Sequence, residues 1–292
     1  MTQKKFHLIS PAIRSLIEDK QGYLRSNPRY YLKMGSRTRK NLHEEATRHS
    51  LNLEMIGFTM RNSLDPVPRG ELVKERKRCE ENLIGAYTWA MNNYDGTLTD
   101  QYIREVARRV EPEINRTGFR TSNVKISGAQ VSPPSAEKVQ REIQIFLIEQ
   151  FLLEDELERA VHAHFSIARI HPLGDGNGRT ARLVQDTILL RANLPLVMIP
   201  FDERPEYINK IDAASASYRQ AEGFLAEASI RKLDRVRALV AERNYRGTEL
   251  AGLTKELMYE RMTPEQNTFY DFLGSKVLFG LSKITEGLSG RR

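Results

Sequence analysis

Residues 171–182 read HPLGDGNGRTAR, and this stretch decides how the middle of the chain folds. Apolar residues at helical spacing precede it over 154–170 and follow it over 179–192, so its three glycines form a turn between two helices. A helix that starts near Gly178 leaves unpaired backbone N–H groups at its N-terminus, and such groups bind anions, phosphate above all. The stretch therefore predicts a helical core with an anion-binding loop.

The side chains of this loop are those that phosphate chemistry needs. Arg179 and Arg182 lie three residues apart on one helix face, and a planar guanidinium can donate two parallel hydrogen bonds to a phosphate. Asp175 offers the single carboxylate that Mg²⁺ commonly takes from a protein when it also binds phosphates. His171 can remove a proton from an attacking hydroxyl near neutral pH.

Other glycine motifs fit this stretch poorly. A calcium loop that began at Asp175 would need glycine at its sixth position, where Thr180 stands, and a Walker A loop would need Gly-Lys followed by Ser or Thr. A purely structural turn with His171 as its cap is the remaining alternative. Five functional side chains at compatible spacing argue against it.

The rest of the chain predicts a mostly α-helical protein of 292 residues. We expect an N-terminal helical segment over 1–70, a core domain over 71–230 and a C-terminal helical extension over 231–292. The exception to the helical pattern is the flap segment, residues 118–134, which reads GFRTSNVKISGAQVSPP. Its alternating residues Val124, Lys125 and Ile126, together with the Pro-Pro turn, predict a short β-hairpin.

The bulk composition limits the class of protein. The formal net charge of +7 allows a nucleic-acid binder as an alternative, but the basic clusters at 37–40 and 74–78 lie in segments that also carry Glu, which favours solvated helix faces. No apolar run is long enough to span a bilayer. The single cysteine, Cys79, cannot form an internal disulfide, so we expect a cytoplasmic location.

The loop resembles the signature of the Fic (filamentation induced by cAMP) family, H-x-F-x-D/E-G-N-G-R-x-x-R. Leu173 departs from it, because the family usually has Phe there. The resemblance covers roughly residues 80–230 and includes the flap segment, so it implies a Fic-type helical core with a hairpin flap. The matching residues are His171, Asp175, Gly176, Asn177, Gly178, Arg179 and Arg182.

This resemblance implies a protein adenylyltransferase, an enzyme that transfers AMP from ATP to a Tyr, Thr or Ser hydroxyl of a target protein. His171 is then the base that takes the hydroxyl proton, and Asp175 holds Mg²⁺ against the phosphates. The α-phosphate lies on Asn177 and on the backbone of Gly176 and Gly178.

For the other parts of the nucleotide and for the target, the resemblance implies further contacts. Arg179 and Arg182 hold the β- and γ-phosphates, and the flap residues 124–126 align the target backbone. Tyr207 and Ser215 follow the signature at a distance that suits the adenine region. The partners expected are ATP and a protein substrate, with neither a membrane nor a nucleic acid.

Many members of the family carry an inhibitory helix, S/T-x-x-x-E-G/N, whose Glu pairs with the second signature Arg. Ser50 and Glu54 have this spacing, so the resemblance implies an autoinhibitory contact between Glu54 and Arg182. Glu81 is the rival, although Lys77 stands where Ser or Thr belongs. The reverse reaction, removal of AMP, transfer of another nucleotide moiety, and a scaffold that binds nucleotide without turnover remain alternatives.

Overall fold

The computed structural model describes residues 8–26, 36–54, 69–126, 131–223, 231–232, 234–236, 238–239 and 248–289, and these are mostly helical, as predicted. The helices along the chain are α1 (Pro11–Ser26), α2 (Ser36–Leu53), α3 (Arg69–Asn93), α4 (Asp100–Val110), α5 (Ala136–Leu152), α6 (Glu156–Ile170), α7 (Asn177–Arg191), the short 3₁₀ helix η1 (Phe201–Glu203), α8 (Arg204–Gly223), α10 (Thr248–Arg261) and α11 (Pro264–Ser289).

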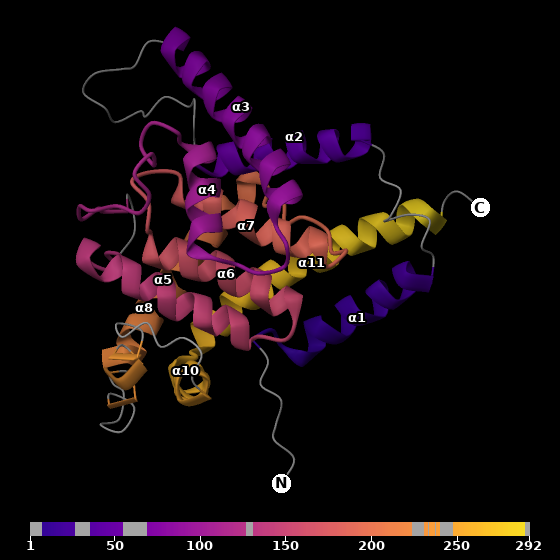
Figure 1. Cartoon of the computed structure of the whole chain (residues 1–292). Coiled ribbons are helices and arrows are strands. Elements are labelled where there is room, and N and C mark those ends of the chain that lie inside the picture. Colours follow the sequence, from indigo (N-terminus) through magenta and orange to yellow (C-terminus); the bar gives the residue numbers. More distant parts are fainter. Residues whose placement is uncertain are drawn as a thin grey trace.

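Helices α6 and α7 form the centre of the molecule and are joined by residues 171–176, while the rest of the 171–182 stretch forms the start of α7 (Figure 1). Asp155 caps the N-terminus of α6 by accepting a hydrogen bond from the Glu158 N–H (2.9 Å). Nearly every residue of both helices is buried, which is the pattern of helices surrounded by other helices. The loop between them is therefore held on a rigid base.

The remaining helices pack around this pair (Figure 1). Helices α3 and α4 lie against α7, α5 lies against α6, and α11 contacts α1, α6 and α8. The main hydrophobic core runs from Ile17 on α1 and Leu51 on α2 to Leu281 on α11, and a separate smaller cluster joins Leu257 of α10 to Ile145 of α5. The predicted N-terminal and C-terminal segments thus share the core of the central region, and the division into three domains stays a prediction.

The flap segment does not form the expected hairpin in its described part. Val124, Lys125 and Ile126 have no strand pairing, and residues 127–130 lie outside the described residues. Alternation over three residues is too short a signal to secure a strand ladder without a partner strand. The polar ends of the segment are instead tied to the loop and to α5, where the Ala136 N–H donates to Asn123 Oδ1 (2.8 Å).

None of the described helices is both long enough and apolar enough to cross a membrane.

Candidate active site

His171 ends α6 with a left-handed backbone, φ 51° and ψ 56°. Such a conformation costs a residue with a Cβ about 1–2 kcal/mol, and it turns the side chain into the pocket beside the loop. Its Nδ1 lies 3.2 Å from the Ala168 carbonyl oxygen, which can only accept, so Nδ1 carries the proton and the neutral ring has a free lone pair on Nε2. Burial outweighs the neighbouring carboxylates and lowers the pKa of His171 below its ordinary value, which favours this neutral form.

The side chain of Asn177 holds the loop closed. Its Oδ1 accepts from the Leu173 N–H (2.9 Å), and its Nδ2 donates to the Leu173 carbonyl (3.1 Å). Leu173 itself is fully buried, as packing beneath the loop requires. The Asn177 side chain expected at the α-phosphate is thus engaged within the loop. Its role at the α-phosphate stays a prediction, and the backbone N–H of Asn177, which lies in the first turn of α7 and has no partner within the helix, is a further donor for a phosphate.

Gly176 and Gly178 are required for different reasons. Gly176 has φ 74°, a left-handed conformation that glycine adopts without strain, and it caps α7. At position 178 a Cβ would collide with the Oε1 atom of Glu54, so only glycine allows this carboxylate to approach the start of α7. The Glu54 carboxylate therefore sits where the helix N-terminus would bind an anion.

Arg179 is buried, with 3% of its side chain exposed, and pairs with two carboxylates. Its Nη1 donates to Glu111 Oε1 (2.5 Å) and its Nη2 to Asp175 Oδ2 (3.1 Å). Glu111 also accepts from Arg78 (3.0 Å). Burial alone would raise the pKa of Glu111, but the hydrogen bond and charge of Arg179 together with those of Arg78 lower it, so the carboxylate is ionised.

Arg182 meets the N-terminal segment as predicted. Its Nη2 donates to Glu54 Oε1 (2.6 Å), and its Nε donates to Ser50 Oγ (2.8 Å). Burial would raise the pKa of Glu54, but the charge and hydrogen bond of Arg182 lower it below the ordinary value. The rival Glu81 lies exposed on α3 and pairs with Lys77 at 3.9 Å. Of the two candidates, the described contacts bring only Glu54 to the loop.

The end of α2 is attached to the site by one further contact. Arg204, at the start of α8, donates from Nε to the carbonyl oxygen of Leu53 (2.6 Å), the last residue of α2. A helix leaves its final carbonyls unpaired, and a cation placed there stabilises the end of the helix. Arg204 therefore helps to hold Glu54 over the loop.

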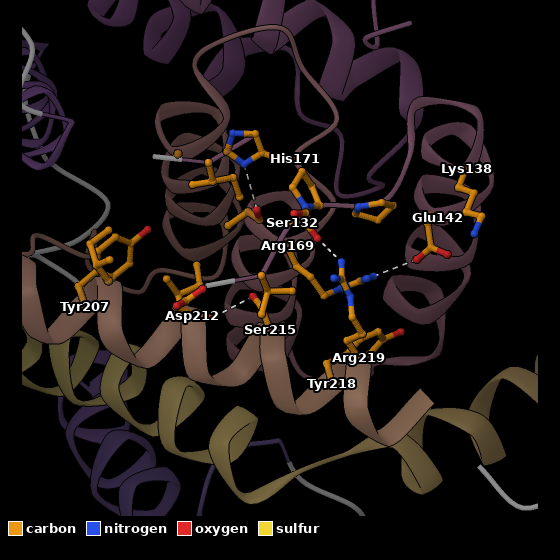
Figure 2. Close-up of a pocket in the computed structure, with 18 of the residues that line it drawn as sticks. Ser132, Lys138, Glu142, Arg169, His171, Tyr207, Asp212, Ser215, Tyr218 and Arg219 are labelled. Atoms are coloured by element: carbon orange, nitrogen blue, oxygen red, sulfur yellow. Dashed lines mark hydrogen bonds and ion pairs between the residues drawn. The ribbon is translucent and has the colours of Figure 1, made fainter. Parts of the chain in front are cut away.

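A cavity of about 580 Å³ opens beside the loop (Figure 2). Its lining includes Glu54, Gly178 and His171, with Ser132 to Ser135 of the flap side opposite α8. Tyr207 and Ser215 both line it from α8, where Figure 2 also shows Asp212, Tyr218 and Arg219 along the same helix. This size suits a nucleotide-sized ligand.

The two residues expected near adenine have local partners. The Tyr207 hydroxyl lies 2.9 Å from His164 Nε2 and 3.4 Å from Arg182 Nη1, which places it beside the arginine. Ser215 donates its hydroxyl to the Ile211 carbonyl (2.7 Å). Their role toward adenine stays a prediction. Of the flap residues, Ile126 lines the cavity.

Asp175 is the loop carboxylate that could hold a metal ion. Its side chain is about half exposed, with Oδ1 accepting from the Gly176 N–H (2.6 Å) and Oδ2 from Arg179. Among the described residues there is no cluster of three or more His, Cys, Asp or Glu able to hold a metal. A lone accessible carboxylate fits Mg²⁺ that takes its other ligands from phosphates and water.

Sequence reasoning missed several residues that organise the site. Glu111 and Arg204 are polar residues without a local motif. Glu111 meets Arg179 because α4 packs on α7, and Arg204 bonds to the end of α2. His164, whose pKa burial lowers to about 3, supports Tyr207 from α6. Arg120, in the flap segment, donates to the carbonyl of His171 (2.8 Å).

Comparisons with known proteins agree with this geometry. Residues 97–189 match the model of the Fic/DOC family. The chain is 28% identical over 216 residues to a protein adenylyltransferase Fic from Drosophila mojavensis, a match that covers 68% of this chain and 42% of that protein. It is 28% identical over 235 residues to a protein adenylyltransferase Fic from Nematostella vectensis, covering 75% of this chain and 54% of that one. The chain thus spans about half the length of the curated relatives it matches.

The fold is also found among solved structures. A Fic domain containing signaling protein from Bacteroides thetaiotaomicron is similar with a TM-score of 0.62 and 17% sequence identity. The similarity covers 95% of this chain and 99% of that one, so it extends beyond the central helices to the elements around them.

Proposed function

From the match of residues 97–189 to the Fic/DOC family and the similarity to protein adenylyltransferases, we propose that this chain is a protein adenylyltransferase that transfers AMP from ATP to a Tyr, Thr or Ser hydroxyl of a target protein. The observation that carries the proposal is the combination of His171, with its imidazole in the cavity, and the free N–H groups at the start of α7 on the same loop. A base and an anion site side by side are what transfer to a hydroxyl requires.

The reaction follows from these groups. The target hydroxyl gives its proton to Nε2 of His171 while its oxygen forms a bond to the α-phosphorus of ATP. The bond between that phosphorus and the oxygen bridging to the β-phosphate breaks, and pyrophosphate leaves with the electron pair. The backbone N–H groups of residues 177–179 stabilise the charge on the α-phosphate, because they already point out of the helix N-terminus.

Mg²⁺ is the cofactor that this site would take. Asp175 would hold it, and the ion would neutralise charge on the phosphates. Arg182 is the cation for the terminal phosphates, provided that Glu54 has left it. Arg179, held by Glu111, keeps Asp175 in place through its second ion pair.

We propose further that the protein is autoinhibited by Glu54. The carboxylate is bound to Arg182 and lies over Gly178, so it occupies the anion site that a phosphate must enter. The reverse reaction, in which Glu54 would position water to remove AMP from a modified protein, is the alternative that the nearness of this carboxylate to the loop favours. A cytoplasmic location is proposed from the single cysteine.

The test uses variants in which the Glu54 carboxylate has been removed, so that Arg182 is free to bind ATP. Glu54→Ala and Glu54→Ala/His171→Ala proteins are incubated with ATP labelled at the α-phosphate or at the γ-phosphate. We expect label on protein only from the α position, with the rate about 10²–10⁴-fold lower without His171, as loss of a general base implies. ATP affinity should stay unchanged, because His171 acts on the hydroxyl. Equal labelling of both proteins, or label from the γ position, would refute the proposal.

A further inference from the structure

Arg120 is a buried arginine whose hydrogen bonds all go to main-chain carbonyls. Its Nε donates to the His171 oxygen (2.8 Å), its Nη1 to Ser122 (3.0 Å) and its Nη2 to Pro134 (2.5 Å). Its own backbone N–H donates to the Pro172 carbonyl (2.8 Å). The residue is 7% exposed, and in the described parts of the chain it forms no ion pair.

This arrangement is unusual for a buried cation, which is normally paired with a carboxylate. The cost of burying the guanidinium is met here by three carbonyl oxygens that belong to three separate points of the chain. Burial lowers the pKa of Arg120 from its ordinary value, in keeping with the absence of a carboxylate partner among the described groups. The geometry uses the flat fork of arginine, because a single lysine nitrogen cannot reach three carbonyls that lie apart.

The carbonyls that accept from Arg120 belong to two elements of the site, the flap segment and the end of α6. Ser122 and Pro134 belong to the two ends of the flap segment, so their bonds to one guanidinium fix the base of that segment. His171 is the residue with the left-handed backbone at the end of α6, and its carbonyl is the third partner. One side chain thus connects the base of the flap to the strained backbone of the proposed catalytic histidine.

We propose that Arg120 is a positioning residue that holds His171 and the flap segment in one fixed relation, and so sets where the target hydroxyl lies relative to Nε2. Arg120 is absent from the lining of the cavity, so it acts through these two elements and not on the nucleotide. The inference rests on the proposed adenylyl transfer for its rate prediction, but the orientation of His171 can be observed without any transfer.

The test compares Arg120→Lys and Arg120→Ala with Arg104→Ala, all in the Glu54→Ala background. Arg104 is a matched control, because it stacks on Phe119 of the same segment (4.3 Å) and bonds to Gln140, while no described hydrogen bond joins it to His171, Ser122 or Pro134. We expect both Arg120 variants to lower the rate of auto-AMPylation by about 10²-fold, the loss that a misplacement of about 1 Å causes, with ATP affinity unchanged. Free guanidinium should restore part of the activity of Arg120→Ala, and Arg104→Ala should keep it.

A second measurement separates this inference from the function itself. The imidazole NMR signals of His171 and the hydrogen exchange of residues 118–136 should change in Arg120→Lys, while the helices α6 and α7 keep their protection. This result would support the inference even if no AMP were transferred. Unchanged His171 signals, an auto-AMPylation rate in Arg120→Lys equal to that of Glu54→Ala alone, or a loss of protection spread over the whole core would overturn it.

Discussion

The two arginines of the 171–182 loop lie one helical turn apart and are equally buried, yet their carboxylate partners come from different parts of the molecule. Arg179 pairs with Glu111, which follows α4 and has 2% of its side chain exposed. Arg182 pairs with Glu54, which follows α2 and is one-third exposed. The first pair is closed on all sides by the core, whereas the second lies at the edge of the cavity.

This difference separates a contact that belongs to the fold from one that can be released. Glu111 is also bound by Arg78, and the Cys79 thiol lies 3.5 Å from its other oxygen, so nothing that enters the cavity can replace it. Glu54 shares Arg182 with a cavity large enough for a nucleotide, so a phosphate can compete for the same cation. The proposed regulation therefore depends on Arg182 and not on Arg179.

The largest expected effect is on stability, from removing the charge of Glu111. The substitution leaves Arg179 with the half-exposed Asp175 as its remaining carboxylate partner, and breaking one side of a buried ion pair costs about 3–5 kcal/mol. We expect Glu111→Gln to lower the free energy of unfolding by this amount in urea titrations followed by circular dichroism. Glu105→Gln is the matched control, since Glu105 pairs with Arg108 and Arg109 on the surface of α4 and should cost about 0–1 kcal/mol.

The pH dependence of stability tests whether the Arg179–Glu111 pair acts through the charge of Glu111. The pKa of Glu111 is lowered in the folded state, so its contribution is complete above the pKa of the unfolded carboxyl and is lost as the pH falls through the folded value. The stability difference between wild type and Glu111→Gln should therefore shrink in acid. If the stability difference between wild type and Glu111→Gln stays constant as the pH falls through the pKa of folded Glu111, the charge of Glu111 does not stabilise the fold through Arg179.

The second largest expected effect is a rise in activity when Arg182 is released from Glu54. We expect Glu54→Ala to raise auto-AMPylation by about 5- to 150-fold, which corresponds to a typical coupling free energy of about 1–3 kcal/mol. Glu81→Ala is the control, because Glu81 is exposed and its partner among the described ion pairs of α3 is Lys77. Intact-mass analysis after incubation with ATP measures both variants. If the two variants label alike, Glu54 is not the inhibitory residue.

The central helices could be predicted from the sequence because their signals are local. The apolar periodicity on both sides of the loop places α6 and α7 within two residues of their observed bounds. The helix N-terminus and His171 beside it follow from the same stretch. The hairpin could not be predicted reliably, since the alternating pattern of Val124–Ile126 is short and the sequence nearby offers no partner strand.

Contacts between distant residues were predicted only where a family pattern pointed to them. Glu54 and Arg182 are 128 residues apart, and the S-x-x-x-E spacing alone is too common to join them. Glu111 meets Arg179 across 68 residues without any motif, because the packing of α4 on α7 decides the pairing. The bonds by which the Asn177 side chain closes the loop on Leu173 were also not predicted, and the role of Asn177 at the α-phosphate stays a prediction.

The smallest expected effect reaches His171 through the same carboxylate. Burial lowers the pKa of His171, while the charge of Glu54 acts in the opposite direction and raises it. Removing that charge in Glu54→Ala should therefore lower the pKa of His171 further, so the neutral base persists to a lower pH. An NMR titration of the imidazole, assigned with His171→Ala, measures the change, and Glu81→Ala should leave the titration where it is in the wild type. A pKa of His171 that rises in Glu54→Ala would mean that Glu54 and His171 do not share the cavity. A nucleotide that enters beside His171 would then not be what releases Arg182 from Glu54.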